Sequence, residues 1–189
     1  QRQMCIRDRF NIDLGKAKYF AGHSLGEYSA LSSAGYLDFS DTLKLLRIRG
    51  DAMQNSVPKG LGGMLAVLGT SVYEIEKILN ENVNNFTVEI ANDNSEGQLV
   101  LSGKNDDLDE LIHILKSKKI KNIRLPVSAP FHCKLMRSAT KIMKNEIEKL
   151  SFHEGKNILI SNVTANEIST RDELTKWLID QSARRVRWR

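Results

Sequence analysis

The sequence has few cysteines, few prolines and no long apolar run. Its two cysteines, Cys5 and Cys133, make neither a disulfide framework nor a metal-binding cluster, so we expect no bound metal. No apolar run approaches the roughly 18 residues that a membrane-spanning helix needs. No signal-peptide pattern is present either. We therefore expect a cytoplasmic protein that does not enter a membrane.

Positive charge is in slight excess, with 28 lysines and arginines against 23 acidic residues. The basic residues are scattered and are not interleaved with aromatic ones, so nothing indicates a nucleic-acid-binding surface. Hydrophobic residues make up 41% of the chain and charged residues 27%, as is usual for globular proteins. A chain of 189 residues can bury a core in one large domain or two small ones.

Periodicity and turn residues predict an α/β protein. Residues 1–9 are charged and aperiodic, so we interpret them as a non-native or flanking segment. Outside the central part of the chain we expect strands and helices at residues 18–23, 27–34, 41–57, 135–150, 158–163 and 171–181, and no clear element after residue 182. These elements form one α/β domain from residues 10–61 and 128–189.

The central part, residues 62–127, shows a β-α-β-β-α-β order. We expect strands at residues 64–68, 86–91, 98–102 and 120–125, a turn at 92–97, and helices capped by Ser71 and by Asn105 or Asp106. This order predicts a ferredoxin-like subdomain that interrupts the first domain.

Gly22-His23-Ser24-Leu25-Gly26 lies between a predicted strand and a predicted helix. It has the Gly-x-Ser-x-Gly pattern of a nucleophile elbow, in which the glycines relieve crowding around an exposed serine. Free N–H groups at the helix N-terminus could stabilise an oxyanion there. Because this short pattern also arises by chance, it makes Ser24 a candidate nucleophile only.

A serine nucleophile needs a base, usually a histidine. His132 lies on a loop at the predicted domain junction and is the candidate base, although a structural role is equally open. Of the other histidines, His23 is interpreted as a residue that shapes the elbow, and His113 and His153 are interpreted as surface residues. No convincing triad acid precedes His132, so a backbone carbonyl is expected to orient it. Cys133 beside it is interpreted as a packed small residue.

Arg47 and Arg49 lie two residues apart on a predicted helix and therefore point in nearly opposite directions. One could face solvent while the other faces inward, where a guanidinium can bind a carboxylate through two hydrogen bonds. The simpler alternative is that both arginines are solvated.

Five motifs in order resemble the malonyl-CoA:acyl carrier protein transacylase family of acyltransferases. They are Gly22-His23-Ser24-Leu25-Gly26-Glu27, Leu46-Arg47-Ile48-Arg49-Gly50, Asn92-x-Asn94-Ser95-x-Gly97-Gln98, Val127-Ser128-Ala129-Pro130-Phe131-His132-Cys133 and Ser161-Asn162-Val163. The resemblance covers about residues 18–181. It implies an α/β-hydrolase-like domain interrupted by a ferredoxin-like subdomain, in agreement with the order of elements.

The resemblance also implies residue roles. Ser24 would accept the acyl group, His132 would be its base, held by a main-chain carbonyl, and Arg49 rather than Arg47 would bind the malonyl carboxylate. The amide of Leu25 would be an oxyanion donor. The remaining substrate-binding positions are Asn92 and Asn94, which line the interdomain cleft, and Phe131, which follows the malonyl-type pattern.

The activity so implied is ping-pong transfer of malonyl from malonyl-CoA to the phosphopantetheine thiol of acyl carrier protein, in fatty acid biosynthesis. Both thiols belong to substrates, so no cofactor is expected, and we expect a monomer. The family's N-terminal Gly-Gln-Gly-Ser-Gln segment and C-terminal Gly-Pro-Gly loop have no counterpart here. We therefore expect an internal fragment with weak activity at best.

Three alternatives remain open at this point. The chain could be an acyltransferase domain of a polyketide synthase. It could be a serine hydrolase, against which Arg49 argues. It could also be an inactive fragment that retains only carrier-protein or CoA binding.

Overall fold

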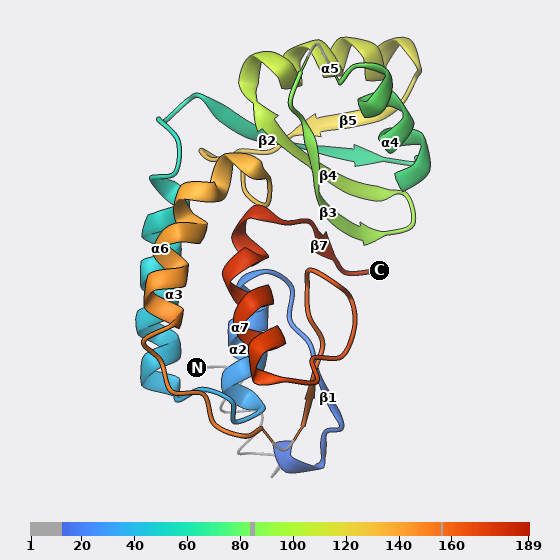
Figure 1. Cartoon of the computed structure of the whole chain (residues 1–189). Coiled ribbons are helices and arrows are strands. Elements are labelled where there is room, and N and C mark those ends of the chain that lie inside the picture. Colours follow the sequence, from blue (N-terminus) through green and yellow to red (C-terminus); the bar gives the residue numbers. More distant parts are fainter. Residues whose placement is uncertain (1–12, 84–85, 156) are drawn as a thin grey trace.

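A computed structural model of the chain describes residues 13–83, 86–155 and 157–189. The predicted flanking segment, residues 1–9, lies outside the described residues. The described part forms two lobes (Figure 1). We call residues 62–124 together with β7 the sheet lobe, and residues 13–61 and 128–185 the helical lobe. Within this part of the chain, no helix has the length and apolar character needed to cross a bilayer.

The sheet lobe has five strands in the order β5-β2-β4-β3-β7. Its elements are β2 (Gly62–Leu68), α4 (Val72–Glu81), β3 (Glu89–Ser95), β4 (Gln98–Lys104), α5 (Asn105–Ser117), β5 (Lys121–Arg124) and β7 (Val186–Arg187). The strands β5-β2-β4-β3 are antiparallel neighbours in the order of a ferredoxin-like unit. The predicted fold class is therefore confirmed, while the exact division at residues 62 and 127 stays a prediction.

Alternating side chains give the sheet two apolar faces. Leu65 and Val67 of β2 and Leu99 and Leu101 of β4 share a core with α4 and α5. On the other face, Met64, Ala91 and Val100 pack with Leu125 and Phe131, where the chain returns to the helical lobe. The sheet therefore lies between its own two helices and the helical lobe.

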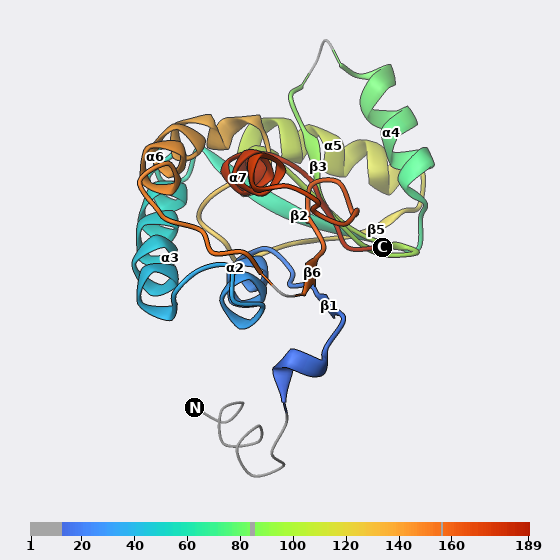
Figure 2. The same ribbon diagram turned by 60° about the horizontal axis from the view of Figure 1, so that its bottom comes forward.

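The helical lobe contains a two-stranded parallel sheet, in which β1 (Tyr19–Phe20) pairs with β6 (Ile158–Leu159). Its helices are α2 (Leu25–Ser33), α3 (Phe39–Gln54), α6 (Arg137–Ile147) and α7 (Arg171–Asp180), with 3-10 turns η1 (Leu14–Lys16), η2 (Lys134–Met136) and η3 (Gln181–Ala183). Helices α3 and α6 lie side by side (Figure 2). Buried residues of α2, α3, α6, β6 and α7 form one core, including Leu31, Leu45, Met143, Leu159 and Leu174.

Several predicted boundaries were wrong. Strand β3 continues through Asn92 and Asn94, which were expected in a turn, because it pairs with β4 across two register shifts. The strand expected at residues 158–163 ends at Leu159, since β1 offers only two residues for pairing. Helix α5 begins at Asn105, and its N-cap position is Lys104.

Residues after 182 do contain a strand, contrary to the prediction. Strand β7 runs between the two lobes and pairs in parallel with β3, with Val186 opposite Asn92 (Figure 1). Trp188 donates its backbone N–H to the carbonyl of Asp93, and Arg187 donates its own to the carbonyl of Asn162. One short strand therefore ties the sheet lobe to the helical lobe.

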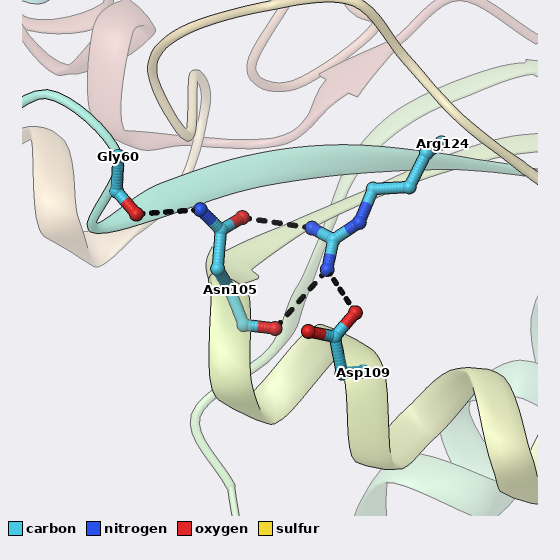
Figure 3. Close-up of polar contacts among 4 residues, drawn as sticks. All are labelled: Gly60, Asn105, Asp109 and Arg124. Atoms are coloured by element: carbon cyan, nitrogen blue, oxygen red, sulfur yellow. Dashed lines mark hydrogen bonds and ion pairs between the residues drawn. The ribbon is translucent and has the colours of Figure 1, made fainter.

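A polar network spans the place where the chain enters the sheet lobe (Figure 3). Asn105 Nδ2 donates to the carbonyl of Gly60 at 2.7 Å, and Asn105 Oδ1 accepts from Arg124 Nη1 at 2.8 Å. Arg124 also pairs with Asp109. The start of α5 is thus fastened both to the incoming segment and to β5, which leads out of the lobe.

Candidate active site

Ser24 lies on a tight turn between β1 and α2, with φ at 53°, a conformation that non-glycine residues rarely adopt. A Cβ on Gly22 would lie 1.9 Å from the carbonyl oxygen of Gly26, so only glycine fits at position 22. A Cβ on Gly26 would meet nothing within 4 Å. The predicted elbow is therefore present, but the expected crowding applies to Gly22 alone.

His132 contacts the serine directly. Its Nε2 lies 2.7 Å from Ser24 Oγ, and its Nδ1 lies 3.0 Å from the carbonyl oxygen of Gln181. Because a carbonyl can only accept, Nδ1 carries the proton and Nε2 is free to accept from the serine hydroxyl. The expected backbone carbonyl is thus in place, and it belongs to Gln181.

The imidazole is buried and is held in its neutral form. Burial, and then the positive charge of Arg49, lower the pKa of His132 to about 4. A neutral imidazole at pH 7 is the form that can take a proton from Ser24.

Arg49 and Arg47 leave α3 in opposite directions, so the simpler alternative, in which both arginines are solvated, does not hold. Arg47 is exposed and pairs with Asp51. The buried Arg49 donates from Nη2 to Ser24 Oγ at 2.9 Å and, from Nε and Nη2, to Oε1 of Gln181 at 3.2 and 2.9 Å. A guanidinium beside the nucleophile can bind an anionic group on the substrate.

Leu25 is the first residue of α2. Its amide belongs to the first helical turn, whose N–H groups lack intrahelical partners and lie at the positive end of the helix dipole. The amide therefore lies at a helix N-terminus, and its role as an oxyanion donor stays a prediction.

Three further residues hold the site together, and sequence reasoning gave them no role. Asn162 Oδ1 accepts from the backbone N–H of Ser24 at 2.6 Å, and its Nδ2 donates to the carbonyl of Gly22 at 2.7 Å. Gln181 Nε2 donates to the carbonyl of Ser24 at 2.9 Å and to Oε2 of Glu27. Asn162 lay in a quoted motif and Glu27 beside the elbow, whereas the sequence carried no signal for Gln181.

Asn92, Asn94 and Phe131 lie further from the serine. Asn92 is buried in β3, next to β7. Asn94 Oδ1 lies 2.8 Å from Nε2 of His23, which joins the elbow to the sheet lobe. Phe131 is half-buried and packs against two apolar clusters, one on each side of the lobe boundary. The structure therefore places all three where the lobes meet.

The remaining candidates are accounted for by packing or exposure. Cys133 is buried, its Sγ donates to the carbonyl of Pro130, and burial raises the pKa of its thiol. His113 is exposed on α5, and His153 is exposed near Asp38. A nucleophile, a neutral base, a buried guanidinium and an amide at a helix N-terminus remain together, and this set suits acyl transfer with an acid-bearing acyl group.

Comparison with known proteins agrees with this geometry. The family described as "Acyl transferase domain" matches residues 16–183. The malonyl CoA-acyl carrier protein transacylase of Escherichia coli (strain K12) is 36% identical over 176 residues, which are 92% of this chain and 57% of that protein.

Solved structures are similar in fold as well as in sequence. The malonyl CoA-acyl carrier protein transacylase from Coxiella burnetii has a TM-score of 0.88 and 39% identity, over 92% of this chain and 55% of that one. A malonyl-transacylase in complex with its type II PKS acyl-carrier protein has a TM-score of 0.89 and 32% identity, over 97% of this chain and 59% of that one. The chain thus spans little more than half the length of these relatives, and it belongs to the acyl transferase domain family.

Proposed function

We propose that this chain carries the malonyl-transfer site of a malonyl-CoA:acyl carrier protein transacylase. The observation that carries the proposal is the position of Ser24 Oγ, which lies 2.7 Å from His132 Nε2 and 2.9 Å from Arg49 Nη2. The names of the relatives from Escherichia coli and Coxiella burnetii support the same activity.

In the first half-reaction, Ser24 Oγ attacks the thioester carbonyl of malonyl-CoA while its proton passes to His132 Nε2. The C–S bond then breaks, the CoA sulfur takes the proton from His132, and a malonyl-serine ester remains. In the second half-reaction, the phosphopantetheine thiol gives its proton to His132 and attacks the ester. Ser24 leaves with that proton, so the enzyme is regenerated.

Two groups would favour the malonyl transition state. The amide of Leu25 would donate to the oxyanion, a contact that can contribute about 3 kcal/mol. Arg49 would bind the malonyl carboxylate in place of its present contact with Ser24 Oγ. A bound acetyl group would leave the guanidinium without that partner, a cost of about 2–3 kcal/mol or roughly a 30- to 150-fold preference for malonyl.

The proposed acceptor is an acyl carrier protein. Asn92, Asn94 and Phe131 are proposed to line the passage that its phosphopantetheine arm takes to Ser24. We propose no resident cofactor, since both thiols arrive with substrates, and operation as a cytoplasmic monomer stays a prediction. A carrier protein of a type II polyketide synthase is the second candidate acceptor, because one structural relative was solved with such a partner. Transfer rates to both kinds of carrier protein would separate these two.

The test is the intact mass of the protein after incubation with malonyl-CoA. We expect a malonyl adduct on the wild-type chain and none on Ser24→Ala. Ser29→Ala is the matched control, because Ser29 is exposed on the same helix, and it should load normally. Folded wild-type protein without an adduct would contradict the proposed activity, and rapid loss of the adduct to water without carrier acylation would favour a hydrolase.

A further inference from the structure

Glu27 is a buried carboxyl group that takes no step in the proposed reaction. Its side chain is 1% exposed, in the first turn of α2 and directly behind the elbow. Oε1 accepts the backbone N–H of Asn162 at 3.1 Å, and Oε2 accepts Nε2 of Gln181. Buried carboxyl groups are uncommon because burial penalises the charged form, so a residue with two such contacts requires an explanation.

We propose that Glu27 is a positioning residue, which fixes the Gln181 amide that holds Arg49 and fixes the Asn162 loop that holds Ser24. The inference rests on the proposed function, because Arg49 and Ser24 are the groups through which Glu27 would act.

The first part of the proposal concerns the orientation of the Gln181 amide. A glutamine side chain offers an acceptor oxygen at one position and a donor nitrogen at the other. Arg49 can only donate, and an ionised Glu27 can only accept. The observed orientation satisfies both, with Oε1 toward Arg49 and Nε2 toward Glu27. A flipped amide would place donor against donor and acceptor against acceptor, so the carboxylate selects the orientation that holds the guanidinium.

The second part concerns the Asn162 loop. Oε1 of Glu27 holds the backbone of Asn162, whose side chain bonds the backbone on both sides of His23, at Gly22 and Ser24. The left-handed conformation of Ser24 is therefore supported by a hydrogen-bonded chain that starts at Glu27. A loss of the carboxylate would loosen the elbow without removing any group that touches the substrate.

The electrostatic surroundings agree with this assignment. The charged and titratable groups that act on Glu27 in the described part of the chain are Arg49 of α3 and Tyr28 of α2. Burial raises the pKa of Glu27 to about 7, against the opposing effects of Gln181, Asn162 and Arg49. Protonation of Glu27 turns one of its two acceptor oxygens into a hydroxyl group, although both Asn162 N–H and Gln181 Nε2 need an acceptor there. The rate of Ser24 malonylation should therefore fall as the pH drops below about 7.

The test compares malonylation of wild-type protein and Glu27→Gln by intact mass against time, from pH 5.5 to 8.5. The matched control is Glu74→Gln, because Glu74 also lies in the first turn of a helix and accepts a side-chain hydrogen bond, from Thr70. We expect Glu27→Gln to slow malonylation roughly 10- to 100-fold. It should also reduce the malonyl-to-acetyl rate ratio and remove the inflection near pH 7. The control should match the wild type.

A double variant that exchanges the side-chain types of Glu27 and Gln181 tests whether the pairing of donor with acceptor matters. This test does not require either single variant to be fully stable. Gln181→Glu alone would place two carboxyl groups together and should load slowly. In Glu27→Gln/Gln181→Glu, the amide at position 27 can donate to the carboxylate at position 181, which also accepts from Arg49. Both Gln181→Glu and the double variant lose the donor to the Ser24 carbonyl, so the double variant should load at least fivefold faster than Gln181→Glu alone.

The outcomes separate the two proposals. Wild-type protein that forms no adduct contradicts the proposed function itself. Wild-type protein that loads, with Glu27→Gln loading at the same rate and the same malonyl-to-acetyl ratio, would overturn the role of Glu27. A double variant no faster than Gln181→Glu would overturn it too, even where Glu27→Gln alone does not fold.

Discussion

At the scale of single residues, the site depends on two backbone conformations that cost free energy. Ser24 and His132 both have positive φ, at 53° and 60°. Non-glycine residues in this region persist where their surroundings hold them. Here the N–H of Ser24 is bonded to Asn162 and the N–H of His132 to the carbonyl of Ser182. The nucleophile and base are thus aligned by their backbones before any substrate arrives.

Removal of the guanidinium should change selectivity more than it changes folding. We expect Arg49→Ala to lower the ratio of malonyl to acetyl loading by roughly 30- to 150-fold, because the malonyl carboxylate loses its charged donor. Competition between malonyl-CoA and acetyl-CoA, followed by intact mass, measures the ratio. Arg47→Ala, on the exposed side of the same helix, should leave it unchanged. An unchanged ratio in Arg49→Ala would contradict the role given to this residue.

The low pKa of His132 links protonation to stability. A histidine whose pKa falls from 6.5 to about 4 on folding contributes stability that is complete above about pH 6.5 and is lost as the pH falls toward 4. At pH 4.5 the loss should be about 2–3 kcal/mol relative to pH 7. Urea unfolding of wild-type protein and of His132→Gln, each at pH 4.5 and pH 7, isolates this contribution. Glu27 titrates in both proteins, so its effect on the free energy of unfolding cancels in the comparison. An equal pH dependence in the two proteins would contradict the buried, neutral state of His132.

Residue types in local motifs could be predicted from the sequence, whereas their partners could not. Ser24, His132 and Arg49 each belong to a short pattern with a chemical meaning. The bond from Gln181 to Glu27 spans 154 positions, and nothing near Gln181 distinguishes it from a surface glutamine after a helix. Such partners are brought together by tertiary packing, and this produces no recognisable local pattern in the sequence.

At the scale of elements, capping made some helices predictable and pairing made the short strands hard to predict. Ser71, as expected, accepts the backbone N–H three residues later at the start of α4, and Thr170 does the same at the start of α7. The length of a strand, in contrast, depends on its neighbour. The strand predicted at residues 158–163 has six residues, but β1 pairs with only two of them.

The small β1–β6 sheet should be the less protected of the two sheets. It has two residue pairs in parallel, whereas β2 and β4 pair over seven residues inside a buried core. Short parallel pairs are weak by themselves and depend on the packing around them. We expect amide hydrogen exchange of Ile158 and Ile160 to be at least tenfold faster than that of Leu65 and Leu101. Equal exchange rates would show that the two sheets open together.

At the scale of the whole molecule, the two lobes are joined by short crossings and by β7. The order of elements could be predicted from periodicity, including the ferredoxin-like unit. The fifth strand could not be, because its two residues, Val186 and Arg187, carry no pattern of their own. They form a strand only because β3 offers an unpaired edge beside them.

The network around Asn105 should stabilise the junction between the lobes. Asn105→Ala removes the side-chain bonds to Gly60 and Arg124 and should lower the free energy of unfolding by about 1–2 kcal/mol (Figure 3). Chemical unfolding measures the change. Asn122→Ala is the control and should have a smaller effect, because among the residues that the structure describes the Asn122 side chain bonds to the nearby carbonyl of Ile120 alone. A larger loss in the control would contradict a special role for this junction.

Strand β7 also sets an order of events during synthesis. The ribosome makes the elbow and the whole β5-β2-β4-β3 sheet long before residues 186 and 187 emerge. Until then the edge of β3 is open to other nascent chains, and the carbonyl of Asn162 lacks the N–H of Arg187. Strand β7 therefore pairs with the edge of β3 and supplies the N–H bond to Asn162 in one step, after the elbow that Asn162 supports has been made.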